Sequence, residues 1–297
     1  MKKNSYIFNS NLKNLFLGII SGLLLIFIIS LVVNLIIKNS NFRLSKVFST
    51  NSLSKYETFY VGNSRSVSFN RNTIENIKFY NLSYNSLNYH EVENILYAIK
   101  KKNIINPTIY IEATALINDN VECRFSIFSN LKYYNKEKIL EKCKTDLFLQ
   151  KFFPISKVKN EIFLRVLYYS FFKEEDQRWQ NNYLMPEKTC LEGNLSPFAQ
   201  EIIKLDSQKK MIVRANNIIE KYSDFNIKFF ITPIFNKKEN YSLKIENEFI
   251  KNLKKGFLLP LNNQIDKNFY TNCKFFADNL HLSPVGIKKI KFLFLNN

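Results

Sequence analysis

An uncharged, strongly apolar run at residues 15–37 dominates the hydrophobic pattern of the chain. A helix of this length rises about 34 Å, which is enough to cross the hydrocarbon core of a bilayer. The run is too long for the apolar core of a typical signal peptide, and no clean small-x-small cleavage site follows it. The pattern therefore predicts a retained transmembrane anchor at residues 15–37. The membrane is then a binding partner of the chain.

The polar segments around this run bear on its orientation. Lysines precede it in residues 1–14, and Lys38, Arg43 and Lys46 follow it, so charge bias does not decide which end faces the cytoplasm. The shortness of residues 1–14 favours a cytoplasmic N-terminus. Residues 38–55 are rich in Ser and Asn and predict a linker. We expect a single-pass cell-membrane protein whose catalytic domain, residues 56–297, lies outside the cytoplasm.

Beyond the linker, short apolar runs alternate with longer amphipathic segments. The runs predict strands at residues 57–61, 78–82, 108–112, 226–231 and 257–261. The amphipathic segments predict helices at residues 89–102, 198–223 and 239–254, and a last helix that begins after Ser283 and Pro284 and ends near Leu295; residues 72–77 fit a helix or a loop. Strand, helix and strand at this spacing are typical of an α/β fold with a parallel sheet. The rhythm is lost at about residues 116–197, which predicts an insertion that acts as a lid or a substrate-binding cap.

Composition narrows the classes of function. The net charge of +18 suggests nucleic acid as a partner, but the lysines are spread along the chain among Asn, Ile and aromatic residues, so we expect no nucleic acid. Two histidines exclude a multi-histidine metal site, and we expect neither a metal nor a cofactor. The four cysteines have no Cys-x-x-Cys spacing. They leave open a disulfide between Cys123 and Cys143 or four reduced thiols.

Two short motifs carry candidate chemistry. Gly62-Asn63-Ser64 follows the first predicted strand, where a turn into a helix can present a serine hydroxyl. Asp278 and His281 lie in a loop before the last helix, at a spacing that lets the carboxylate bond to imidazole Nδ1 and leaves Nε2 free to accept a proton. In a parallel sheet both motifs reach the same edge. The simpler interpretation, a turn serine with a capping aspartate and a surface histidine, stays open.

These motifs, with Asn81-Leu82-Ser83-Tyr84-Asn85-Ser86 after the second strand, resemble the SGNH/GDSL hydrolase superfamily over roughly residues 56–295. The resemblance implies a flavodoxin-like three-layer α/β/α sandwich. It also implies a catalytic triad of Ser64 as nucleophile, His281 as base and Asp278 as orienting acid. The backbone N–H groups of Ser64 and Ser86 are implied as the oxyanion hole.

The chain departs from the family pattern after the third strand. By register, Leu116 stands where the family has an oxyanion-hole asparagine, and Asn118 and Asp119 follow close by. Loss of one such donor costs on the order of 10²–10³ in rate. Arg65 fits either an anion-binding residue or a partner of a surface carboxylate. His90, at the start of a helix, fits a solvated or capping role.

Members of the superfamily with a degenerate third motif and an N-terminal anchor look like proteins that act on envelope polysaccharides. We therefore expect a membrane-anchored serine esterase or O-acyltransferase that acts on acetyl or other ester groups of a surface polysaccharide. A transferase needs a membrane partner protein that delivers the acyl group. The alternative is a catalytically inactive scaffold or binding module that keeps the fold in envelope polysaccharide assembly.

Overall fold

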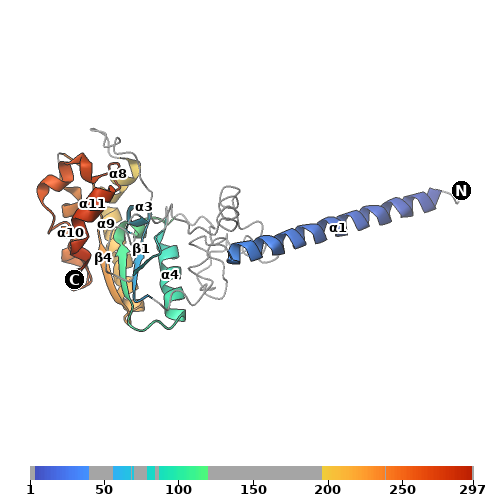
Figure 1. Ribbon diagram of the computed structural model, residues 1–297, viewed down its shortest axis with the longest axis horizontal. Helices are drawn as coiled ribbons and strands as arrows, with labels where there is room; N and C mark the ends of the chain where they lie inside the picture. Colours follow the sequence, from blue (N-terminus) through green and yellow to red (C-terminus); the bar gives the residue numbers. More distant parts are fainter. Residues whose placement is uncertain are drawn as a thin grey trace. The chain divides into compact units, whose positions relative to one another are not determined.

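The computed structural model describes residues 4–39, 56–67, 69, 79–83, 87–119, 196–237 and 239–295. One compact unit contains α1 (Asn4–Asn39), a single unbroken helix (Figure 1). Within α1, Leu12–Val32 is long and apolar enough to cross a membrane by length and composition, and its large apolar side chains are exposed. The predicted apolar N-terminal helix is therefore present, while most of the predicted linker lies outside the described residues.

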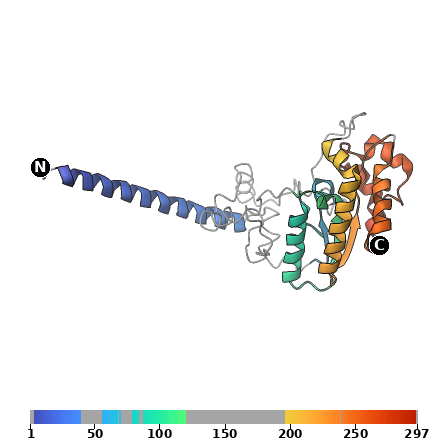
Figure 2. The same ribbon diagram turned by 180° about the vertical axis from the view of Figure 1, so that it is seen from behind.

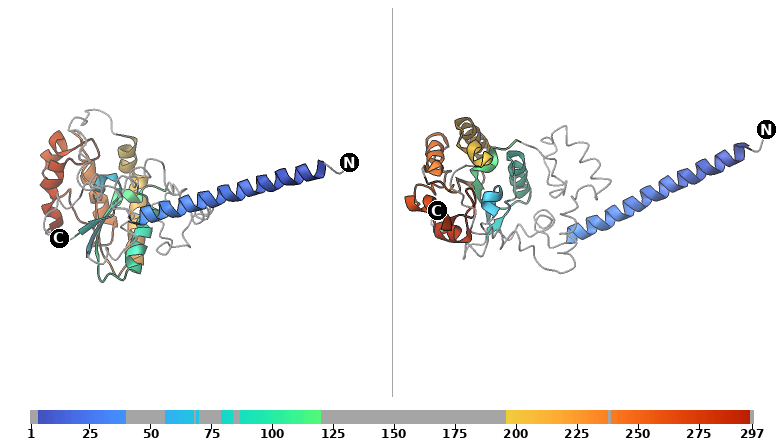
Figure 3. Two further views of the ribbon diagram at one scale, coloured as in Figure 1. Left: turned by 45° about the vertical axis from the view of Figure 1, so that its right-hand side comes forward. Right: turned by 90° about the horizontal axis from the view of Figure 1, so that it is seen from above.

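A second unit holds a parallel sheet of four strands, β1 (Thr58–Val61), β2 (Phe79–Asn81), β3 (Thr108–Glu112) and β4 (Asn226–Phe230). Their order is β2-β1-β3-β4, and every neighbouring pair is parallel. In register, Tyr60 of β1 lies opposite Tyr110 of β3. The predicted α/β fold with a parallel sheet is confirmed, and its strands bring their carboxyl ends to one edge (Figure 3).

The fifth predicted strand is reduced to one parallel bridge. Leu258 pairs with Phe229, supported by a 2.7 Å bond from Phe229 N to Phe257 O and a 2.7 Å bond from Leu259 N to Phe229 O. The ladder ends there because the next backbone N–H that would face β4 is that of Leu261, and it does not reach β4. Leu261 N then turns back to Leu259 O. The apolar pattern of residues 257–261 predicted more strand than the backbone forms.

The described helices that follow the sheet strands largely match the sequence pattern. They are α4 (Tyr89–Lys101), α8 (Pro197–Ile203), α9 (Leu205–Lys221), α10 (Tyr241–Asn252), α11 (Pro284–Ile290) and α12 (Phe292–Leu295). Asn88 and Glu91 form a reciprocal capping box on α4, so Asn88 rather than His90 caps this helix. One continuous helix was predicted where α8 and α9 stand; Lys204 between them has an extended backbone with ψ 133°. The predicted last helix is likewise divided, at Lys291.

An aromatic cluster packs the C-terminal helices onto one face of the sheet. Tyr60 stacks on Tyr110 with ring centroids 5.0 Å apart, and Phe294 of α12 meets both Tyr60 and Phe230 edge-on at 5.5 and 5.3 Å. α4 and α9 lie side by side (Figure 2), joined by an ion pair of 2.9 Å between Lys221 and Glu93. Burial of large aromatic side chains from sheet and helices fixes the frame on which the loops at the sheet edge stand.

The insertion predicted at about residues 116–197 lies almost wholly outside the described residues. Leu116 and Ile117, at its start, are buried and follow directly from β3 through the 3₁₀ helix η2 (Ala113–Leu116). Cys273, in the 3₁₀ helix η8 (Cys273–Phe275), is disulfide-bonded. The alternative of four reduced thiols is therefore wrong, while the prediction for Cys123 and Cys143 falls on residues outside the described ranges.

Candidate active site

Ser64 stands at the first position of the short helix α3 (Ser64–Val67), directly after the turn that ends β1. Gly62 makes this turn possible because the chain approaches β3 closely. A Cβ at position 62 would lie 2.2 Å from Ser66 Oγ and 2.6 Å from Glu112 Cβ. Asn63 completes the turn, since its Oδ1 accepts a 3.1 Å bond from Arg65 N. The local sequence therefore places the Ser64 hydroxyl at the carboxyl edge of the sheet.

The second motif forms a self-contained loop before α11. Ala277 N donates to His281 O at 2.8 Å, and Phe276 and Leu282 form an antiparallel bridge that closes the loop. Inside it, Asp278 Oδ1 accepts bonds from the backbone N–H groups of Leu280 and His281 at 2.7 and 2.8 Å. The aspartate carboxylate is therefore held by the backbone of the same loop that carries the histidine.

Ser64, His281 and Asp278 meet in the order required for a proton relay. Asp278 Oδ2 lies 2.7 Å from His281 Nδ1, and His281 Nε2 lies 2.9 Å from Ser64 Oγ. The three predicted triad residues are thus brought together, from segments 217 positions apart in the chain. The distances are within ordinary hydrogen-bond range for a nucleophile, its base and the group that orients the base.

The protonation states follow from the carboxylate. Burial alone raises the pKa of Asp278, but its hydrogen bond and charge interaction with His281, together with the two backbone N–H bonds, hold that pKa below its ordinary value. An ionised carboxylate is an acceptor only, so Nδ1 of a neutral His281 carries the proton. Nε2 is then the acceptor for the Ser64 hydroxyl, which is the tautomer a general base needs.

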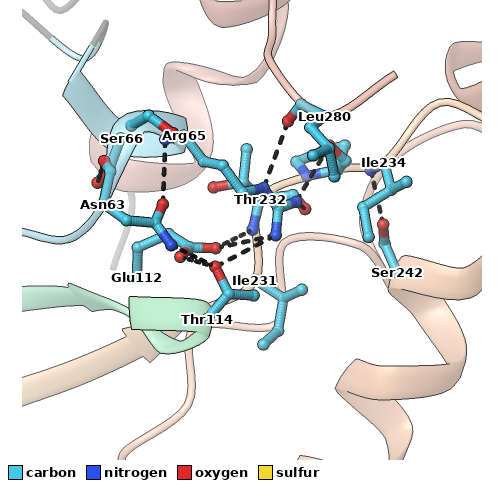
Figure 4. Close-up of polar contacts among 12 residues, drawn as sticks. Asn63, Arg65, Ser66, Glu112, Thr114, Ile231, Thr232, Ile234, Ser242 and Leu280 are labelled. Carbon is cyan, nitrogen blue, oxygen red and sulfur yellow. Dashed lines mark hydrogen bonds and ion pairs between the residues drawn. The ribbon is translucent and has the colours of Figure 1, made fainter. Parts of the chain in front are cut away.

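Arg65 differs from both of its sequence interpretations. Its side chain is completely buried, so it is neither an exposed anion-binding residue nor a partner of a surface carboxylate. Nη1 lies 3.3 Å from Glu112 Oε1, and both side chains have 0% exposure. Figure 4 shows the Arg65 side chain among polar contacts with Glu112, Thr114, Thr232 and Leu280. The arginine type suggested a surface role because isolated charges are rarely buried.

Glu112 and Thr114 complete this buried cluster, and the sequence did not single out either as functional. Thr114 Oγ1 donates to Glu112 Oε2 and accepts from Asn63 Nδ2 at 2.9 Å. Glu112 Oε1 also accepts from the backbone N–H of Thr232, at the end of β4, at 3.3 Å. The sequence feature that could have indicated this cluster is a glutamate at the end of an otherwise apolar buried strand.

Asn81, at the end of β2, binds backbone carbonyls of α3 and of Phe69. Its side-chain amide donates to the carbonyls of Ser66 at 2.8 Å, Val67 at 3.3 Å and Phe69, and its Oδ1 accepts from Ser83 N at 2.8 Å. It thereby supplies a donor for the carbonyls at the end of α3, which is too short to pair them internally. The proposed second oxyanion donor, Ser86, lies outside the described residues.

The segment after β3 has an apolar side chain at the register position of the family's oxyanion-hole asparagine. Leu116 is fully buried. Asp119 forms ion pairs with Lys210 and Arg214 of α9, and Asn118 O accepts from Tyr89 N at 3.3 Å. The remaining predicted donor, the backbone N–H of Ser64, belongs to the first turn of α3, where a helical N–H has no partner within the helix.

Within the described ranges, no group of three or more His, Cys, Asp or Glu side chains is arranged to hold a metal ion. The chemistry that the described site offers is transfer of a proton from Ser64 Oγ to His281 Nε2, with Asp278 balancing the positive charge that forms on the ring. No protein-family model and no curated protein matches the chain.

Proposed function

We propose that this protein is a serine esterase or O-acyltransferase of the SGNH/GDSL type. The observation that carries the proposal is the continuous chain of hydrogen bonds Asp278–His281–Ser64, at 2.7 and 2.9 Å. The strand order β2-β1-β3-β4 is compatible with the flavodoxin-like three-layer sandwich of that superfamily. Placement of the serine and histidine at the carboxyl edge of a parallel sheet also supports it.

The reaction begins with attack on an ester. Ser64 Oγ forms a bond to the ester carbonyl carbon while His281 Nε2 takes the hydroxyl proton, and Asp278 stabilises the imidazolium. The backbone N–H groups of Ser64 and Ser86 donate to the oxyanion. The ester C–O bond then breaks as His281 returns the proton to the leaving alcohol, which leaves an acyl group on Ser64.

The acyl-enzyme is resolved by a second hydroxyl. His281 takes a proton from water or from a sugar hydroxyl, the new oxygen bonds to the acyl carbon, and Ser64 Oγ leaves with the proton. Water gives hydrolysis and a sugar gives O-acyl transfer. The substrate we propose is an acetylated surface polysaccharide, reached from a membrane anchor in α1, and for transfer a membrane partner protein supplies the acyl group.

Fluorophosphonate labelling of the full chain in detergent micelles tests the proposal. We expect the wild type to be labelled and Ser64→Ala to be unlabelled. Ser66→Ala is the matched control on the same helix. Ser66 Oγ is bonded to Ser83 Oγ at 2.9 Å and Asn63 O at 3.1 Å, so its hydroxyl is not the group that reacts. We therefore expect this variant to keep its labelling. A wild type that resists the probe, or a Ser64→Ala variant that still reacts, contradicts the proposal.

A second candidate function is an inactive scaffold or binding module of polysaccharide assembly. The observation that favours it is Leu116, a buried apolar side chain at the register position of an oxyanion donor. The same experiment separates the two, since a scaffold gives no Ser64-dependent labelling. For an active enzyme, p-nitrophenyl acetate with and without added oligosaccharide then shows whether the acetyl group passes to water or to a sugar.

A further inference from the structure

Arg65 is a positive charge removed entirely from water beside the proposed nucleophile. Burial lowers the pKa of its guanidinium, while the negative charges of Glu112 and Asp278 act in the opposite direction. Taking an ion pair out of water costs several kcal/mol per ion, which only close geometry and further hydrogen bonds offset. An ion pair is therefore an inefficient way to fill this space, and a packed apolar side chain would serve stability as well. The contacts of Arg65 suggest a role other than stability.

The planar fork of Arg65 reaches three separate segments of the chain. Nη1 contacts Glu112 Oε1 at 3.3 Å, at the end of β3, and Thr114 Oγ1 at 3.4 Å, in η2 directly after it. Nη2 donates to the carbonyl of Thr232 and lies 3.4 Å from that of Pro233, after β4. Nε donates to Leu280 O at 3.3 Å, in the loop of the histidine.

Arg65 and its acceptor Leu280 each adjoin a proposed catalytic residue. Arg65 directly follows Ser64, and Leu280 directly precedes His281. The Asp278–His281 pair is held within its own loop by the Asp278 bonds to Leu280 N and His281 N. The Ser64–His281 distance, in contrast, depends on how two segments remote in sequence are held together, and the bond from Arg65 Nε to Leu280 O joins these two segments.

We propose that Arg65, neutralised and oriented by Glu112, is a positioning residue that holds the histidine loop against the Ser64 turn. The inference rests on the proposed serine chemistry and goes beyond it. Lysine cannot replace this function, because an ammonium is a point donor and lacks the fixed fork that reaches Glu112, Thr232 and Leu280 at once. The charges of Arg65 and Glu112 serve to align Ser64 with His281, and they do not contact the substrate.

Two variants separate alignment from folding. Arg65→Met with Glu112→Gln removes both charges, so that no unpaired charge is left buried. Arg65→Lys keeps a charge near Glu112 and loses the fork. The matched control is Glu246→Gln in α10, where another buried carboxylate accepts bonds from the backbone and side-chain amides of Asn262 and Asn263 at 2.7–2.9 Å, without a contact to the triad.

The measurement is the saturation kinetics of fluorophosphonate labelling on the full chain in detergent micelles, with thermal unfolding followed in parallel. A misplacement of the reacting groups by about 1 Å costs on the order of 100-fold, so we expect the maximal labelling rate to fall by this factor in both Arg65 variants. The probe concentration at half-saturation stays unchanged, because the probe does not contact Arg65. Glu246→Gln lowers the melting temperature. At temperatures below its thermal unfolding transition, this variant labels at the wild-type maximal rate.

The outcomes are distinct. A folded Arg65 variant whose maximal labelling rate is within about threefold of wild type overturns the positioning role. A rate loss that Glu246→Gln shares below its transition also overturns it, because loss of any buried charge would then suffice. If the double variant does not fold, Arg65→Lys alone carries the test by the same criterion. A wild type that is not labelled at all rejects the proposed function itself, before the variants are compared.

Discussion

Asp278→Asn is the substitution that perturbs the site most selectively, because it keeps the shape of the side chain. Asp278 Oδ1 accepts two backbone N–H bonds, from Leu280 at 2.7 Å and from His281 at 2.8 Å. An asparagine whose carbonyl oxygen keeps these two bonds must turn its NH₂ group toward His281 Nδ1. Nδ1 then becomes an acceptor and the proton moves to Nε2. In that tautomer Nε2, the nitrogen that faces Ser64 Oγ, has no lone pair to accept the proton.

The size of the effect follows from this tautomer change. For a Ser-His-Asp triad with intact geometry and the wrong tautomer, the rate falls on the order of 10⁴-fold. Stability changes by less, since three charge-assisted hydrogen bonds become neutral ones that differ by about 1 kcal/mol each, about 3 kcal/mol in total, against about 5.5 kcal/mol for the rate. We therefore expect Asp278→Asn to fold and to label with fluorophosphonate about 10⁴-fold more slowly than wild type.

The assay is a time course of labelling at neutral pH on the full chain in micelles. Asp266→Asn is the matched control, because Asp266 Oδ1 also accepts a backbone N–H, from Asn268 at 2.6 Å, at the start of the 3₁₀ helix η7 (Lys267–Thr271). This control keeps the wild-type rate. If Asp278→Asn labels within about tenfold of wild type, the tautomer argument is refuted.

Four further predictions test other parts of the account. Gly62→Ala forces its Cβ to within 2.2 Å of Ser66 Oγ and should cost about 1–3 kcal/mol in urea unfolding; unchanged stability would contradict the close approach. Asn81→Ala leaves carbonyls at the end of α3 without their donor and should cost a similar amount, about 1–3 kcal/mol, in the same assay. Folding lowers the pKa of Asp278, so its carboxylate adds stability above its unfolded pKa of about 3.9 and loses it as the pH falls through the folded value. The melting temperature of Asp278→Asn should thus depend less on pH in the acid range than that of wild type. A disulfide-dependent reporter enzyme fused to the C-terminus should be active, and an inactive fusion would contradict an extracytoplasmic domain.

The strands and the meeting of Ser64, Asp278 and His281 were accessible from sequence because their signals are local. β1, β3 and β4 are apolar runs bounded by polar turns, and Asp278 lies three positions before His281. Joining that loop to Ser64 required only the rule that parallel strands end at one edge. The break between α8 and α9 had no such signal, because Lys204 is an ordinary helix former and neither Gly nor Pro is present there.

The buried charges were not accessible because they depend on tertiary contacts. Arginine and glutamate are residue types that usually lie at the surface. Only the close approach of the Ser64 turn to β3 buries Arg65 and Glu112 together. Likewise, no sequence pattern indicates that Arg65 Nε reaches Leu280 O from 215 positions away. The meeting of Ser64 and His281 was thus predicted, while Arg65, which we propose aligns them, became visible only in three dimensions.

The central claim is that Ser64 is the nucleophile, and mass spectrometry of the fluorophosphonate-treated full chain tests it most directly. After proteolysis, we predict one phosphonylated peptide, with the modification on Ser64 and none on Ser66. Substitution of His281 by Gln should abolish this adduct, because Nε2 is the acceptor 2.9 Å from Ser64 Oγ. An adduct on another residue, or no adduct with intact protein, would contradict the account.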